Sequence, residues 1–144
     1  MQITPKQLTS FSISGFIVSL LVHILTLTQI YLVSNITVGA LTIGMLAVWL
    51  LASKLVKESG ETQDNPWKSV FTTTPPWLRY LFYFVLVYAL LNTLLELKLE
   101  SGAGYIDTDV SASKIRVISG FWLLFYNFGF MVGISKPAES NSVN

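Results

Sequence analysis

The amino-acid sequence predicts an all-α, polytopic membrane protein whose four helices form an antiparallel transmembrane bundle. Two observations predict this fold class. The chain of 144 residues is 52% hydrophobic and only 12% charged, whereas a soluble domain carries about 25% charged residues. It also contains four segments that reach the roughly 20 mostly apolar residues needed to cross a bilayer. The lipid bilayer is therefore the first predicted partner of the chain.

The predicted spans lie at about residues 11–33, 36–56, 77–97 and 115–135, so residues 1–135 form one transmembrane domain. Only a few residues separate the first two spans, which must therefore form an antiparallel hairpin. Residues 136–144 are polar, and we expect a disordered tail there.

Basic residues in the connections predict the orientation. If the N-terminus is cytoplasmic, six basic residues lie on that side and three on the other: Lys6, Lys54, Lys57, Lys68, Arg79 and Lys136 against Lys98, Lys114 and Arg116. Because cytoplasmic loops carry the excess of Lys and Arg, both termini are predicted to be cytoplasmic.

Two stretches outside the apolar runs carry local signals. Thr4, Pro5 and Gln7 form the pattern of a capping box, which would let the first helix begin there. Such a helix would extend about 28 residues, or about 42 Å. Between the second and third spans, the stretch from Pro66 to Trp77 mixes charge with tryptophan, which prefers the headgroup level. We expect it to lie on the inner membrane surface.

Several classes of function are disfavoured by what the chain lacks. The net charge of +1 gives no basic field for nucleic acid. The absence of cysteine excludes disulfides and thiolate metal sites. The sequence has no zinc-protease motif, nucleophile elbow, P-loop or dinucleotide fingerprint. The leading expectation is therefore a protein that is not an enzyme and holds no metal.

The one histidine, His23, lies in the middle of the first apolar run. At helical spacing it shares a face with Ser12, Gly15, Ser19 and Thr26. Such a stripe should meet other helices, because lipid rewards neither polarity nor close backbone approach. One interpretation is a neutral histidine bonded to a hydroxyl or a carbonyl. The other is a ligand or a proton relay, since ionisable groups inside membranes are usually functional.

The identity of a ligand at His23 is only partly constrained. One histidine supplies one ligand, whereas zinc takes three or four. A haem held by two histidines would require a dimer. A quinone or a lipid is therefore favoured over haem or a metal if anything binds there.

The third span carries Tyr80, Phe84, Tyr88, Asn92 and Glu96 at steps of four. This stripe is explained by an aromatic belt with helix packing. Alternatively, it lines a site for an amphipathic ligand, with Tyr88 and Asn92 at depths comparable with His23.

Small residues predict where helices approach one another closely. Gly129 and Gly133 form a G-x-x-x-G pattern, and Ala40 and Gly44 form a second small-residue pair. Predicted packing residues are Gly15, Ser19, Ala40, Gly44, Gly129 and Gly133. Asn127, a strongly polar residue of the fourth span, should form hydrogen bonds within the bundle.

Glu96 and Arg116 should reach the same outer interface, at the end of the third span and the start of the fourth. An ion pair would relieve two poorly solvated charges, and the planar guanidinium suits a carboxylate. The alternative is that Arg116 extends to phosphate headgroups while Glu96 faces water.

The stretch from Arg116 to Tyr126 resembles the last helix of a family of small, uncharacterised bacterial membrane proteins with four helices. In that family an Arg is followed by Ser-Gly-His-Trp-x-x-Phe-Tyr, and the first helix contains a histidine. Positions that match are Ser119, Gly120, Trp122, Phe125 and Tyr126, together with His23. Position 121 is Phe here, so the chain lacks one of the two histidines. The resemblance implies a bacterial inner-membrane protein.

These observations leave three expectations for function. The first is a non-enzymatic membrane protein without a cofactor, either an accessory subunit beside other membrane subunits or a bundle that associates with itself. The second is a redox or quinone- or lipid-binding module centred on His23, Tyr88, Asn92 and Asn127. The third is a small transporter, although no span is interrupted by a central proline.

Overall fold

The computed structural model describes residues 4–28, 34–59, 66–100 and 112–135. These residues form five helices and, within the described ranges, no strand: α1 (Pro5–Leu27), α2 (Asn35–Ser59), α3 (Pro66–Thr73), α4 (Pro76–Glu100) and α5 (Ala112–Ile134). All except α3 are long and apolar enough to cross a membrane. The predicted all-α fold class is confirmed. The predicted tail, residues 136–144, lies outside the described residues.

The start of α1 is the predicted capping box. The backbone N–H of Gln7 donates to Thr4 Oγ1 at 3.3 Å, and the N–H of Thr4 donates to Gln7 Oε1 at 2.9 Å. The helix ends at Leu27 and spans 23 residues, or about 35 Å. The predicted length of 28 residues is therefore too long. Thr28 caps the helix, and its hydroxyl donates to the carbonyl of Leu25 at 2.9 Å.

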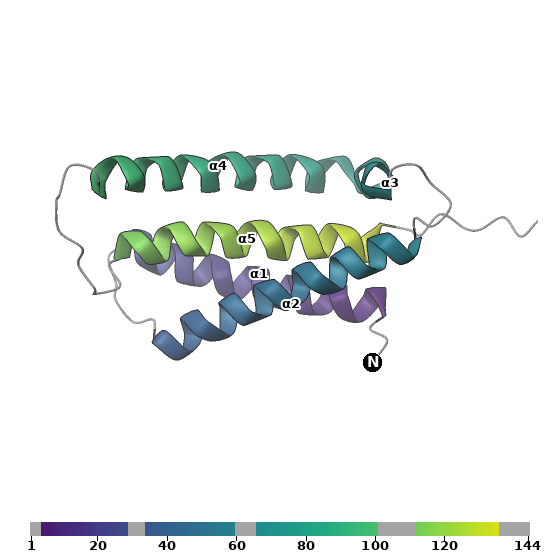
Figure 1. Cartoon of the computed structure of the whole chain (residues 1–144), viewed down its shortest axis with the longest axis horizontal. Helices are drawn as coiled ribbons and strands as arrows, with labels where there is room; N and C mark the ends of the chain where they lie inside the picture. Colours follow the sequence, from purple (N-terminus) through teal and green to yellow (C-terminus); the bar gives the residue numbers. More distant parts are fainter. Residues whose placement is uncertain (1–3, 29–33, 60–65, 101–111, 136–144) are drawn as a thin grey trace, which may run out of the picture.

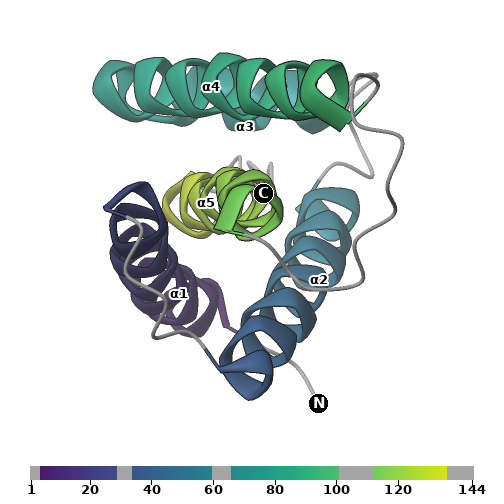
Figure 2. The same ribbon diagram turned by 90° about the vertical axis from the view of Figure 1, so that its left-hand side faces the viewer.

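The four long helices alternate in direction, and α5 lies at the centre (Figures 1 and 2). The α1–α2 hairpin covers one side of α5, and α4 covers the other. In the most apolar stretch of α5, 50% of the residues are buried, whereas in the most apolar stretch of α4 only 17% are buried. The other helices therefore pack around α5, which is the last of the described helices.

The short helix α3 runs across the axis of the bundle, since Figure 1 shows it end-on while the long helices lie lengthwise. Within α3, the side chain of Val70 is buried. The ring of Phe71 stacks on the ring of Tyr83, with centroids 6.2 Å apart. Trp67 packs against Phe128 at 5.7 Å. A helix that lies across the end of a bundle has the geometry of an interfacial helix. Its place on the inner membrane surface stays a prediction.

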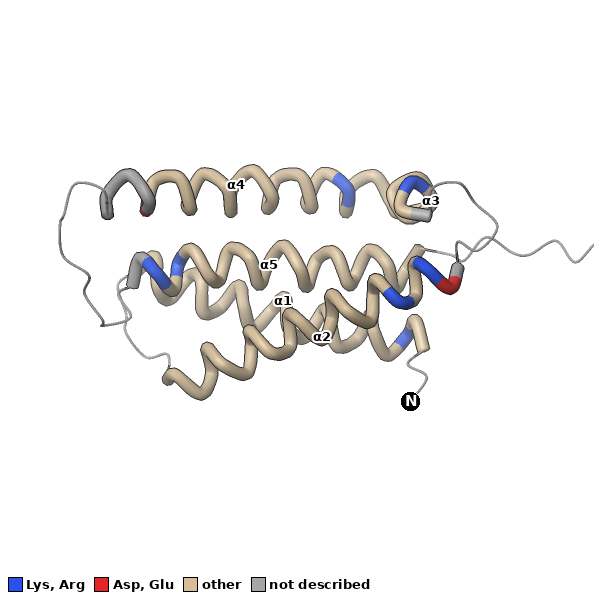
Figure 3. The backbone as a smooth tube through the Cα atoms, in the orientation of Figure 1, with Lys and Arg blue, Asp and Glu red and all other residues tan. Residues whose placement is uncertain are grey.

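Charged residues gather at the two ends of the bundle and are missing from the middle of every long helix (Figure 3). One end, which we call the basic end, carries Lys6, Lys54, Lys57, Lys68 and Arg79. The other, which we call the far end, carries Lys114 and Arg116 among the residues whose side chains are described. The apolar middle fits the hydrocarbon core of a bilayer, and the ends fit its two interfaces.

Candidate functional site at His23

The polar stripe of α1 faces α5. Ser12, Ser19, His23 and Thr26 are all buried, with His23 only 4% exposed. The register is set at the basic end, where a Cβ on Gly133 would collide with the hydroxyl of Thr9. Close approach of the two backbones there brings the far-end half of α1 against the first turns of α5. His23 therefore lies inside the protein and not in lipid.

His23 joins three helices through its two ring nitrogens. Nδ1 lies 2.7 Å from Ser119 Oγ on α5, and Nε2 lies 2.5 Å from Tyr88 Oη on α4. The rings of His23 and Tyr88 also meet edge to face, with centroids 5.3 Å apart. We call His23, Tyr88 and Ser119 the His23 junction.

The available protons determine which atoms of the His23 junction donate hydrogen bonds and which accept them. The hydroxyl of Ser119 donates to the carbonyl of Arg116 at 3.0 Å. A serine hydroxyl has one proton, so Ser119 Oγ must accept the bond from His23, which places a proton on Nδ1. In the neutral imidazole Nε2 is then an acceptor, and Tyr88 donates to it. Both nitrogens are occupied by side chains of the same chain.

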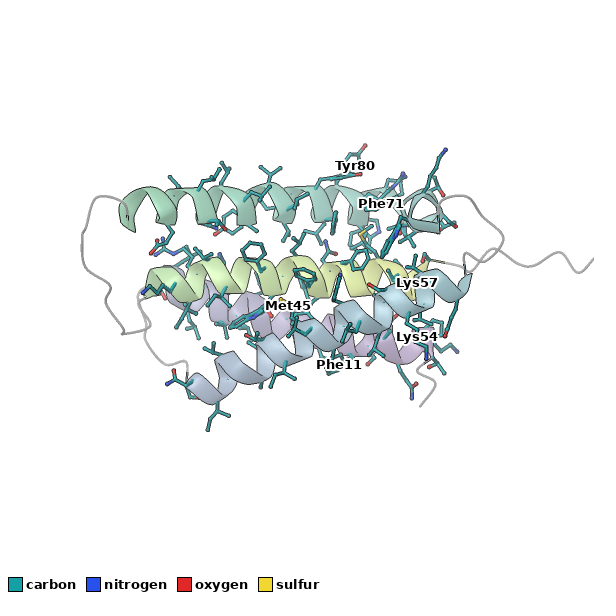
Figure 4. All side chains as sticks on the ribbon, viewed as in Figure 1. Phe11, Met45, Lys54, Lys57, Phe71 and Tyr80 are labelled. Carbon is teal, nitrogen blue, oxygen red and sulfur yellow. The ribbon has the colours of Figure 1, made fainter. Side chains whose placement is uncertain are left out.

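The stripe of α4 winds from the outside of the bundle to its inside. Tyr80 is 73% exposed and points away from the bundle (Figure 4), and Phe84 is 68% exposed. Tyr88 and Asn92 are half-buried. The cause is helical geometry, because each step of four residues advances about 40° around a helix of 3.6 residues per turn. The stripe is therefore not one continuous lining, and Phe84 reaches the site only by stacking on Tyr88, with centroids 6.3 Å apart.

Asn92 and Arg116 lie beside the His23 junction, one turn nearer the far end. Asn92 follows Tyr88 by four residues on α4, and Arg116 precedes Ser119 by three on the antiparallel α5. Within the described residues, Asn92 Nδ2 and Arg116 Nε are both buried and have no hydrogen-bond partner.

The predicted ion pair between Glu96 and Arg116 does not form. Among the described residues an ion pair joins Lys54 to Glu58 at 3.6 Å, and none joins Glu96 to Arg116. Arg116 has its Nε enclosed by protein beside the His23 junction, whereas Glu96 lies a further turn along α4. The two charges therefore lie at different levels of the bundle.

Asn127 is separate from the His23 junction. It follows Ser119 by eight residues, or about 12 Å along α5, and the apolar side chains of Leu123 and Leu124 lie between them. Its side chain is 1% exposed, and neither amide atom has a hydrogen-bond partner in the described part of the chain. The prediction that Asn127 forms hydrogen bonds within the bundle is therefore wrong for the residues that the structure describes.

Glycines on two helices enclose the ring of Tyr126 from α5. A Cβ on Gly15 of α1 would overlap that ring, and a Cβ on Gly44 of α2 would overlap its hydroxyl oxygen. The hydroxyl donates to the carbonyl of Leu41 at 3.1 Å. Gly129 is equally restricted, because its Cβ would collide with Val48 and Ser12.

Ala40 is exposed, which does not support its predicted role in helix packing. The buried face of α2 contains Leu41, Gly44 and Val48. Ala40 precedes Leu41 by one residue and is therefore turned away from that face. Sequence reasoning did not single out Ser119 or Tyr126 as site residues. Both belong to the motif that resembles the bacterial family, which was the signal available.

No family model, curated protein sequence or solved structure matches this chain. The resemblance to the bacterial family therefore stays a prediction. Across the four described ranges, no three His, Cys, Asp or Glu side chains come together.

Proposed function

We propose that the protein is a non-enzymatic integral membrane bundle, which acts either as an accessory subunit of a larger membrane complex or by associating with itself. Four helices are long and apolar enough to cross a membrane, which fits a small integral membrane protein. The observation that carries the proposal is the occupation of both His23 nitrogens by Tyr88 and Ser119. The one histidine of the chain, buried between helices, is thereby used to join them.

Other polar side chains within the spans support the same interpretation. Trp122 donates from its indole nitrogen to Thr42 Oγ1 at 3.2 Å, joining α5 to α2. Tyr126 also joins these helices through the carbonyl of Leu41. Polar residues in membranes commonly connect helices in this way.

The test is the absorption spectrum of the purified protein, followed by lipid extraction and mass spectrometry of the same sample. We expect no Soret band and no quinone in a stoichiometric amount. Native mass spectrometry then counts copies of the chain, which separates a self-associating bundle from a single accessory subunit. A stoichiometric quinone that is lost in His23→Leu would overturn the proposal.

A second candidate is a quinone- or lipid-binding module at the His23 junction. It is favoured by the position of Tyr88, which is half-buried and stacks on the exposed ring of Phe84. A ligand carbonyl arriving from the membrane would have to take the place of His23 as the acceptor for the Tyr88 hydroxyl. The small-transporter alternative gains no support from the described residues.

For location, we propose a bacterial inner membrane with both termini cytoplasmic. The support is the uneven charge of the two ends, since the basic end is the one where α1 begins and α5 finishes (Figure 3). Reporters fused after Lys136 and within residues 58–65 should then be cytoplasmic, and those within residues 102–107 should be exported. Reporters on both sides of α5 in the same compartment would refute the four-span topology.

A further inference from the structure

Two buried hydrogen-bond donors lie one helical turn from the His23 junction and have no acceptor among the described residues. They are Asn92 Nδ2 and Arg116 Nε, each buried and without a partner among the described residues. Each lies one turn nearer the far end than a member of the His23 junction, on helices that pack against each other. One turn away, at the level of the His23 junction, a Cβ on Gly120 would meet Ala89 at 3.5 Å, so α4 and α5 are in contact there.

Three described acceptors near these donors already accept other hydrogen bonds. The acceptor nitrogen of His23, Nε2, is taken by Tyr88. The carbonyl of Arg116 accepts from Ser119, and the hydroxyl of Thr26 donates to the carbonyl of His23 at 2.7 Å. Glu96 makes no ion pair with Arg116. A buried donor without an acceptor is costly, more so when it is charged. Neither donor has an acceptor among the described residues, and a ligand oxygen would supply one.

From this geometry we propose that Arg116 and Asn92 bind the phosphate of a phospholipid headgroup between α4 and α5 at the far end. A guanidinium donates two parallel bonds to phosphate oxygens, which an amide N–H then supplements. Arg116 belongs to the first turns of α5, where the positive end of the helix dipole also favours an anion. The site goes beyond the proposed function, because a bundle of either kind would hold such a lipid.

The surface next to these donors suits acyl chains and not a free anion. The outward face of α4 at this end consists of exposed apolar side chains, among them Leu91 and Leu94. A lipid whose phosphate reaches Arg116 would lay its chains along that face. Glu96 is the nearest described carboxylate on α4 and would weaken the binding of an anion by repulsion.

The experiment titrates the purified protein in a neutral maltoside detergent with phosphatidylglycerol and follows binding by native mass spectrometry. One lipid should bind to the wild-type chain. Arg116→Gln should weaken its affinity about tenfold, and Asn92→Leu should weaken it by a smaller factor. Arg79→Gln is the matched control, because it removes the same charge at the basic end and should leave the affinity unchanged.

Two further probes separate the sources of the phosphate. Diacylglycerol with the same acyl chains should not bind, and inorganic phosphate should bind far more weakly than the lipid. Glu96→Gln should strengthen lipid binding, which keeps the proposal testable if Arg116→Gln fails to fold. Equal losses in Arg116→Gln and Arg79→Gln, or equal binding of diacylglycerol, would overturn the proposed site. Equal binding of inorganic phosphate would overturn the lipid as its occupant.

Discussion

The two sides of α5 are packed by different means. Toward α1 and α2, a Cβ on Gly15, Gly44 or Gly129 would collide with a neighbouring side chain. Toward α4, a Cβ on Gly120 would make only ordinary contact with Ala89. On that side, aromatic rings such as Phe82 and Phe128, 6.2 Å apart, fill the space.

This difference indicates how each side is held in a membrane. Lipid chains are as apolar as the helices, so association depends on close packing and on hydrogen bonds between helices. The α1–α2–α5 side has the close packing. The α4 side has looser ring contacts, and the His23 junction is what connects α4 to both α1 and α5. Substitutions on the two sides should therefore differ in size.

The largest effect is expected on the close-packed side. Gly15→Leu would place a side chain in the volume of the Tyr126 ring, and it should lower the free energy of unfolding by about 3 kcal/mol, the upper part of the usual range for overpacking. Unfolding in a mixed detergent titration, followed by circular dichroism, measures this. Gly39→Leu is the control, because nothing lies within 4 Å of its added Cβ. Similar losses in both variants would contradict the proposed packing.

His23→Lys should have the next largest effect. A charge at bilayer depth costs about 2.5–3.5 kcal/mol on insertion scales, and the ammonium would stand among the Tyr88 and Ser119 hydroxyls. His23→Leu should cost less, since it leaves those hydroxyls unpaired but adds no charge. The yield of folded protein and its unfolding free energy should follow the order wild type, Leu, Lys. Equal stability of the Lys and Leu variants would show that position 23 reaches water.

Removing one bond of the His23 junction should have a smaller effect. Tyr88→Phe deletes only the hydroxyl that meets Nε2, and hydrogen bonds between membrane helices average about 0.6 kcal/mol, with a maximum near 1.7 kcal/mol. The same detergent titration measures the loss. Tyr80→Phe should leave stability unchanged, because that side chain is 73% exposed. If Tyr88→Phe also has no effect, the α4 side is held by its rings alone.

The smallest effect is expected for Glu96 and Arg116, for which the sequence left an ion pair and two independent charges as alternatives. Glu96 and Arg116 make no ion pair, so a double-mutant cycle of Glu96→Gln and Arg116→Gln in lipid-free detergent should be additive within about 0.5 kcal/mol. The cycle compares the unfolding free energies of the two single variants and the double variant. A coupling well above that value would restore the ion pair and place both charges at one level.

The sequence was sufficient for the presence of the four long helices and for the face on which His23 lies, because periodicity records which side of a helix is buried. It did not predict α3 as a helix. It did not identify the partners of that face. Ser119 and Tyr88 lie on two other helices, and their proximity depends on a register set by Gly133 against Thr9. The predicted hydrogen bonds of Asn127 and the predicted packing of Ala40 lack support for a related reason. Residue type indicates which side chains need partners, but only the packed fold determines whether partners are present.

The most direct test of the His23 junction uses the fact that the chain has one histidine. Labelling the protein with ¹⁵N-histidine gives nuclear magnetic resonance signals from one imidazole alone. We expect a neutral ring at pH 7 with the proton on Nδ1, directed to Ser119, and with Nε2 as an acceptor. Tyr88→Phe should shift the Nε2 signal toward that of an unbonded nitrogen and leave Nδ1 nearly unchanged. A proton on Nε2 alone, or signals that do not respond to Tyr88→Phe, would contradict the junction between α1, α4 and α5.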